Sequence, residues 1–160
     1  MFNERINTFE TNSSSTHAIC ITKERNIIVL PDKINFKLTD YGREFQVLRE
    51  VDEKASFLYT AIMYLNYCND PDIITINDFY AMFDEINCNF VNDGERHYID
   101  GINIIAPVIK RICRNKNKLY RFLFHYNSFI IIGSDERSTD YDKIEDIIIH
   151  AEYPNECYYG

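Results

Sequence analysis

Residues 9–23, FETNSSSTHAICITK, contain a polar segment that is followed directly, after His17, by an apolar one. The polar part consists of one asparagine and five hydroxyl residues, from Thr11 to Thr16. It ends at His17, and the apolar run Ala18-Ile19-Cys20-Ile21 follows at once. A short continuous apolar run beside a turn-rich segment predicts a buried β-strand over residues 17–23.

Further strands and helices are predicted from the same kind of pattern. SFIIIG at 128–133 predicts a central strand, and residues 26–30 and 34–38 predict two more. Apolar spacing predicts a helix over residues 52–68 and another over residues 76–90, which Thr75 caps. A third helix is expected to have Pro107 in its first turn, and a last helix is expected to be capped by Thr139. Asn115-Lys116-Asn117 is a candidate break before another helical stretch, 119–124.

The order of these elements predicts the fold class. Strands first, helices next, then one strand and one helix indicate a single α+β domain over residues 1–160. We expect a mostly antiparallel sheet, made of the N-terminal strands and the strand near 128–133, with about four helices packed on one face.

Composition narrows the class of protein. A chain of 160 residues with 46% hydrophobic content can bury a sizeable core as one domain. Its five cysteines are scattered and form no CxxC pair, which indicates reduced thiols and argues against a disulfide frame or a zinc knuckle. The start lacks a signal-peptide pattern, and no apolar run is long enough for a membrane helix, so a soluble, cytoplasmic protein without membrane contact is expected.

Charge is unevenly distributed along the chain. The net charge is −8, yet residues 110–121, KRICRNKNKLYR, contain six basic and no acidic side chains. This segment is expected to pair with the acidic C-terminal segment 135–160; a patch facing phosphates, with Tyr120 and Phe122 between the cations, is the alternative. A globally acidic protein is a poor general binder of nucleic acid and suits a partner protein with a basic, nucleic-acid-binding surface.

The polar segment before the first strand has two interpretations. Hydroxyl side chains commonly form turns and caps. Alternatively, a phosphoester or nucleotide could bind a pocket with an acid–base histidine and supporting carboxylates. The residues of that pocket would be Asn12, Ser13, Ser14, Ser15 and His17, with Asp100 and Asp135. No glycine-rich loop or P-loop lysine accompanies them.

The four histidines predict no metal site. His97 and Asp100 are three apart and could share a site, but no second pair with ligand spacing supports zinc or a two-metal centre. No metal and no cofactor are therefore expected.

The C-terminal segment contains the candidate residues for a partner interface. Tyrosine buries a large area at low entropy cost, and carboxylates suit a cationic groove. The candidates are Asp135, Glu136, Asp140, Asp142, Glu145, Asp146, Tyr153, Tyr158 and Tyr159. The alternative is a tail that folds back onto its own domain.

Four stretches carry a resemblance to a known family. FETNSSSTHAICI (9–21), KASFLYTAI (54–62), HYIDGIN (97–103) and RFLFHYNSFIIIGSDE (121–136) occur in the order found in small, uncharacterised phage and prophage proteins of Gram-positive bacteria. The chain resembles that family, but it has Asp100-Gly101-Ile102 where the family pattern has Asp-His-Gln.

The resemblance implies a phage context and no particular activity. Together with the acidic charge, it leads us to expect an anti-CRISPR-type inhibitor that binds a host nuclease, with a Cas-type nuclease as the leading partner, and no catalysis. The alternative is a phosphoester-binding or hydrolysing enzyme that uses Ser13–Ser15 and His17.

Overall fold

The computed structural model describes residues 2–5, 17–24, 29–134, 137–151 and 155–159. These residues form an α+β fold, as expected. The strands are β1 Phe2–Arg5, β2 His17–Thr22, β3 Lys33–Phe36, β4 Gln46–Leu48, β5 Asn87–Phe90, β6 Phe129–Ile132 and β7 Asn155–Tyr159. The helices are α1 Val51–Tyr67, α2 Ile76–Ala81, α3 Ile102–Cys113, α4 Lys116–Phe124 and α5 Arg137–Ile149. No helix among these residues is both long and apolar enough to cross a bilayer.

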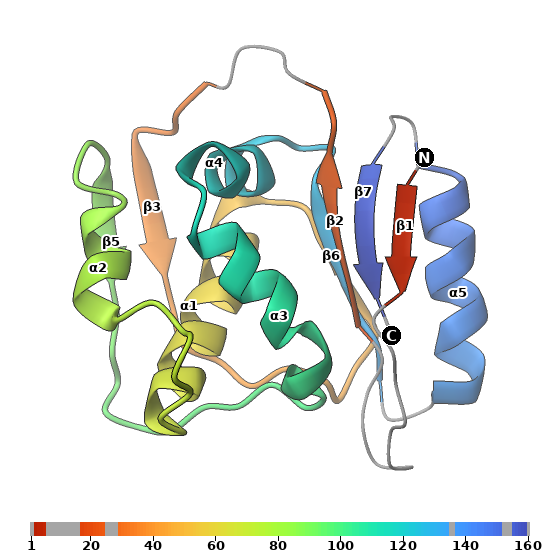
Figure 1. Cartoon of the computed structure of the whole chain (residues 1–160), viewed down its shortest axis with the longest axis horizontal. Coiled ribbons are helices and arrows are strands. Elements are labelled where there is room, and N and C mark those ends of the chain that lie inside the picture. The colour runs from red at the N-terminus through yellow and green to blue at the C-terminus, as the bar shows by residue number, and fades with distance from the viewer. Residues whose placement is uncertain (1, 6–16, 25–28, 135–136, 152–154, 160) are drawn as a thin grey trace.

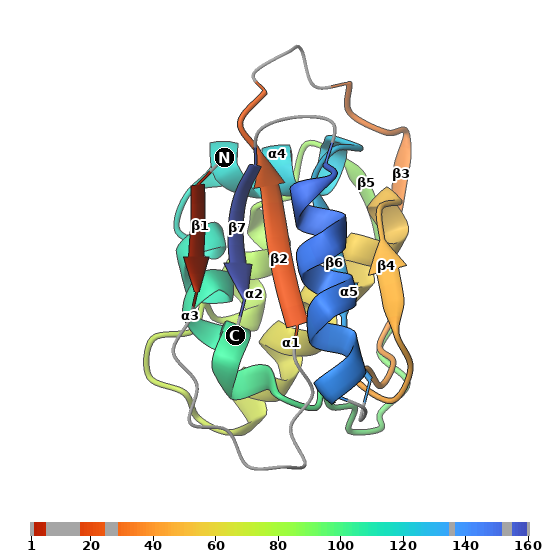
Figure 2. The same cartoon turned by 90° about the vertical axis from the view of Figure 1, so that its right-hand side faces the viewer.

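The main sheet has five strands in the order β1-β7-β2-β6-β4 (Figure 2). Strand β2 pairs antiparallel with β6 on one side and with β7 on the other, and β4 extends the sheet beyond β6. Among these strands, only β1, at the edge of the sheet, pairs in parallel with its neighbour β7. The prediction of a mostly antiparallel sheet containing the strands at 17–23 and 128–133 is therefore confirmed.

Helices cover both faces of this sheet, because its central strands are apolar on both sides. Helices α1, α3 and α4 lie on one face, and α5 lies alone on the other (Figures 1 and 2). Ile19 and Ile130 point into the larger core, whereas Cys20 and Ile131 point toward α5. The expectation of helices on one face was therefore wrong for α5. A strand that is buried on both faces explains the continuous apolar runs in the sequence.

A second, two-stranded parallel sheet joins β3 to β5. Phe36 of β3 stacks on Phe90 of β5, with ring centroids 4.3 Å apart, and forms a T-shaped pair with Phe79 of α2, with centroids 5.8 Å apart. The predicted helix over 76–90 was therefore too long. Thr75 caps α2 as expected, but β5 finds its backbone hydrogen-bond partners on β3, which local periodicity does not reveal.

Other element boundaries also differ from the expectations. Pro107 lies inside α3, where it and Asn103 are exposed, so water can satisfy the carbonyl that the missing N–H leaves free. Helix α5 begins at Arg137, before the expected cap Thr139. Val29 and Leu30 belong to no strand, and the rest of the strand expected at 26–30 lies largely outside the described residues.

A buried lysine connects the first helix to the loop before β6. Lys54 of α1 is fully buried, and its ammonium donates hydrogen bonds to the carbonyl oxygens of His125 and Ser128, both at 2.9 Å. Burial, helped by the charge of Arg49, lowers the pKa of Lys54 to about 7. The side chain therefore anchors α1 to the end of α4 and the start of β6.

We expect Lys54→Met to destabilise the fold, because the buried carbonyl of Ser128 loses its donor, at about 1–3 kcal/mol, and the partly buried carbonyl of His125 loses one as well. The lowered pKa also makes the loss depend on pH. The folded state releases the proton near pH 7 and the unfolded state near 10.5, so wild-type stability rises between these values. Urea denaturation should show a larger gap between the two proteins at pH about 9.5 than at about 7. An equal gap at both values would contradict a buried, shifted amine.

Candidate functional site

His17 is the predicted site residue whose surroundings the structure defines best. It is the first residue of β2 and is fully buried. The backbone N–H of Gly133 donates to its Nδ1 at 3.1 Å, and its Nε2 hydrogen-bonds to the backbone carbonyl of Asp100. Because Nδ1 accepts from an amide, the ring proton lies on Nε2 and is donated to that carbonyl. Both ring nitrogens are therefore bonded to the protein's own backbone.

The hydrogen bonds of His17 join three segments that are far apart in the sequence. These are the start of β2, the turn before α3 and the end of β6. Gly42 supports the turn: its φ is +111°, and a Cβ there would lie 2.6 Å from the Cβ of Asp100. Asp100 is held in place by its N–H, which donates to the carbonyl of Tyr41 at 3.0 Å.

This arrangement bears on the predicted phosphate pocket. His17 and Asp100 do come together, but Asp100 meets the ring through its backbone carbonyl rather than its carboxylate. The remaining pocket residues, Asn12, Ser13, Ser14, Ser15 and Asp135, lie outside the described residues. In the described part of the chain, His17 therefore acts as a structural hydrogen-bonding residue.

Tyr158 is the clearest correction to the predicted partner interface. It is only 1% exposed, because β7 is inserted between β1 and β2 in the main sheet. Arg111 lies over its ring at 4.9 Å from the centroid, and its hydroxyl donates to the carboxylate of Glu156. Burial and this hydrogen bond raise the pKa of Tyr158 to about 12. Tyr158 is therefore part of the core and cannot anchor a partner in this conformation.

The acidic candidates on α5 are placed differently. Asp142 and Asp146 are exposed one helical turn apart, and Glu145 between them is half-buried. Asp146 also lies 3.2 Å from the ring of His150. Asp140 and Tyr159 belong to α5 and β7, but their side chains are not described; Asp135, Glu136 and Tyr153 lie outside the described residues.

The basic segment 110–121 is partly neutralised by acids from several parts of the chain. Lys110 lies 2.7 Å from Asp70, and this hydrogen bond lowers the pKa of that carboxyl. A looser pair joins Lys116 to Glu85 at 3.8 Å. Lys118 reaches Glu156 at 3.6 Å. The expected pairing with the acidic C-terminal segment is therefore found for one of these three pairs, and the other two involve acids from elsewhere in the chain.

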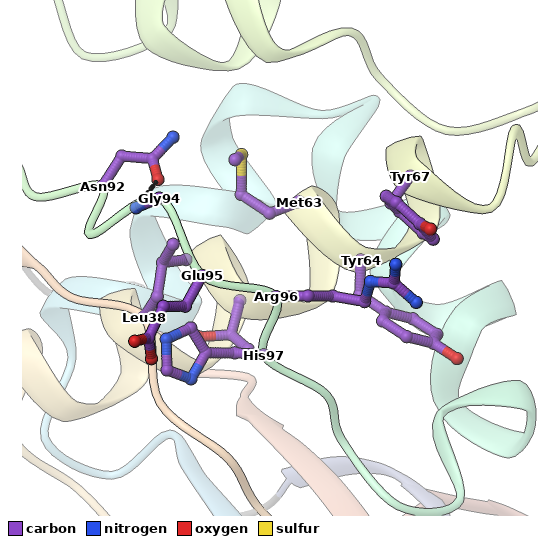
Figure 3. A pocket seen from close by; sticks show the side chains of 10 residues that line it. Leu38, Met63, Tyr64, Tyr67, Asn92, Gly94, Glu95, Arg96 and His97 are labelled. Carbon is purple, nitrogen blue, oxygen red and sulfur yellow. Dashed lines mark hydrogen bonds between the residues drawn. The ribbon is translucent and has the colours of Figure 1, made fainter.

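A cleft of about 450 Å³ lies beside α1 and was not foreseen from the sequence. Tyr64 and Tyr67 of α1 form one wall, and the segment after β5 forms another (Figure 3). The guanidinium of Arg96 lies over the Tyr67 ring at 3.8 Å from the centroid. The lining residues are Leu38, Thr60, Met63, Tyr64, Tyr67, Asn92, Gly94, Glu95, Arg96 and His97. The only sequence signal was the run of polar residues after the turn at Gly94.

His97 lines this cleft and contacts two carboxylates. Its Nε2 lies 2.7 Å from Asp93 and its Nδ1 lies 3.3 Å from Asp40. Burial alone would lower the pKa of His97, but hydrogen bonding and attraction to Asp93 and Asp40 outweigh it and raise the pKa. The carboxylates next to His97 are thus those of Asp93 and Asp40, whereas the backbone of Asp100, which sequence spacing alone would have allowed to share a site with His97, bonds to His17 and Tyr41.

Comparison with protein-family models, with curated proteins and with solved structures finds no match to the chain.

His17→Ala should destabilise the protein, because the buried Gly133 N–H loses its acceptor, at about 1–3 kcal/mol, and the side-chain hydrogen bond to the Asp100 carbonyl is also lost. His17→Gln offers one donor and one acceptor and should lose less. Chemical denaturation measures both, with His150→Ala as the exposed control. A loss for His17→Ala no larger than for that control would disprove the structural role.

His97→Ala should cost more stability in acid than in base. A raised histidine pKa stabilises the folded state fully below the ordinary histidine pKa of about 6.5, and this contribution disappears as pH rises through the folded-state pKa. Denaturation of both proteins at pH about 5.5 and about 8.5 tests the difference. Asp40→Asn, which keeps an acceptor for the Tyr98 N–H but removes the charge, should reduce the pH dependence. Identical differences at the two pH values would refute this account.

Proposed function

We propose that this protein is a phage-encoded inhibitor of the anti-CRISPR type. It binds a host defence nuclease, with a Cas-type nuclease as the leading candidate, and covers the basic, nucleic-acid-binding surface of that nuclease. The single observation that carries the proposal is the outer face of α5, defined here by Asp142, Asp146 and Ile149. The phage setting comes from the resemblance of the sequence motifs alone.

The outer face of α5 combines negative charge with one exposed apolar side chain. Asp142, Asp146 and Ile149 follow one another at helical spacing, and Ile149 is 62% exposed. The opposite side of the helix buries Ile144 and Ile148 against the sheet, so the helix is held in one orientation. Acidic side chains steer a basic partner, and an apolar side chain among them supplies area that can be desolvated.

The surroundings of His17 support a binding protein over a phosphoester enzyme. An acid–base group must exchange a proton with its substrate, whereas both nitrogens of His17 are bonded to the backbone in the interior. Because Tyr158 is buried, we base the proposed contact on the acidic candidates of α5.

A retention experiment with immobilised protein and a lysate of a Gram-positive host tests the proposal. We expect the wild type to retain a nuclease, and the double reversal Asp142→Lys with Asp146→Lys to slow its association at least several-fold. Asp72→Lys with Asp84→Lys is the matched control, because both acids are exposed and flank α2 in the sequence, and α2 and α5 lie at opposite ends of the molecule (Figure 1). The control should bind like the wild type.

Salt provides the second readout. Raising ionic strength from about 0.1 M to about 1 M shortens the screening length from about 10 Å to about 3 Å, so retention should fall. The retained nuclease, once purified, should lose cleavage activity when the wild type is added. Retention that is unaffected by the α5 reversal, or a nuclease that cleaves normally in the complex, would rule the proposal out.

A further inference from the structure

Three side chains with metal-ligating atoms meet at the edge of the cleft beside α1. They are Asp93, Glu95 and His97, and the ligand atoms of all three lie within 4.8 Å of one another. All three come from the segment that follows β5, at every second position. Figure 3 shows the carboxylate of Glu95 next to the ring of His97.

The backbone of this segment orients the ligand atoms. Gly94 has a φ of +77°, a left-handed conformation that side-chain-bearing residues rarely adopt. The N–H of Glu95 donates to Asp93 Oδ1 at 3.0 Å, which leaves Oδ2 facing His97 Nε2 at 2.7 Å. The turn therefore directs one carboxylate oxygen and one imidazole nitrogen toward each other.

A fourth residue from another part of the chain orients the imidazole. The N–H of Tyr98 donates to Asp40 Oδ1 at 3.1 Å, and the same oxygen lies 3.3 Å from His97 Nδ1. With Nδ1–H directed at this carboxylate, Nε2 is the nitrogen available to a metal. Metal-bound histidines in proteins are commonly held by a carboxylate in this way. Asp40 contributes this contact independently of the Asp93–His97 segment.

We propose that Asp93, Glu95 and His97 bind a divalent first-row transition-metal ion such as Zn²⁺ or Co²⁺. One imidazole and two carboxylates suit these ions, with imidazole nitrogen as the selective ligand. The ion takes the place of the proton between His97 Nε2 and Asp93, and that proton goes to solvent.

The cleft determines what such an ion can do. Glu95 and His97 both line it, so coordination positions that the protein does not fill face a space of about 450 Å³. Sites with three protein ligands and an open position accept water or an oxygen-donor ligand. This site is separate from the outer face of α5, and its test does not depend on a partner protein.

Titration of the metal-stripped full chain with Zn²⁺ and Co²⁺ tests the inference. We expect one ion per chain by calorimetry, and a Co²⁺ absorption spectrum without the thiolate charge-transfer band that coordination by the exposed Cys68 would produce. Glu95→Gln and His97→Ala should each lower the affinity at least about tenfold, and Asp40→Asn, which alters only the residue behind His97, about tenfold.

His150→Ala is the matched control. His150 and Asp146 also form an exposed histidine–carboxylate pair, but among the described residues no third ligand joins them. The affinity of this variant should equal that of the wild type. Thermal unfolding without metal shows that each variant is folded, and Glu95→Gln changes only an exposed side chain. No stoichiometric binding by the wild type, a thiolate band, or unchanged affinity in Glu95→Gln and His97→Ala would each overturn the proposal.

Discussion

Strand β2 must be covered on both of its faces, and the rest of the fold follows from this requirement. Its side chains alternate between two cores, so one layer of helices cannot bury them all. Helices α1, α3 and α4 therefore pack on one face and α5 on the other. Both edges of the strand are also hydrogen-bonded, to β6 and to β7. The C-terminal strand is thus part of the centre of the sheet, and α5 is fixed as an outer layer whose free side faces solvent.

The polar end of the same strand creates a second requirement, because the buried imidazole of His17 needs hydrogen-bond partners within the protein. His17 meets it by accepting from Gly133 and donating to Asp100. These bonds tie the sheet to the turn that leads into α3. A histidine at the end of a hydroxyl-rich segment can therefore have a structural explanation, since a buried strand end needs a side chain that both donates and accepts.

The two proposed binding surfaces lie on different layers. The outer face of α5 is beyond the sheet, whereas the cleft lies beside α1 on the other side of it. Each is built on a rigid element: α5 is held by Ile144 and Ile148, and α1 is held by the buried contacts of Lys54. A partner on α5 and an ion at the cleft could therefore be bound at the same time. The chemistry differs as well, with charge steering on α5 and direct coordination at the cleft.

The sequence by itself determined the α+β class, the strands at the two continuous apolar runs, the first helix and the cap at Thr75, because these depend on contacts between near neighbours. Only the tertiary structure decided that residues 87–90 form a strand, that Tyr158 is buried, and that Asp40 meets His97. In each case the deciding partner is distant in the chain: β3 for β5, β2 for β7, and the loop after β3 for His97. Local periodicity does not reveal such partners, because a short apolar run is compatible with a helix or a strand. The backbone hydrogen bonds to a distant segment determine which of the two forms.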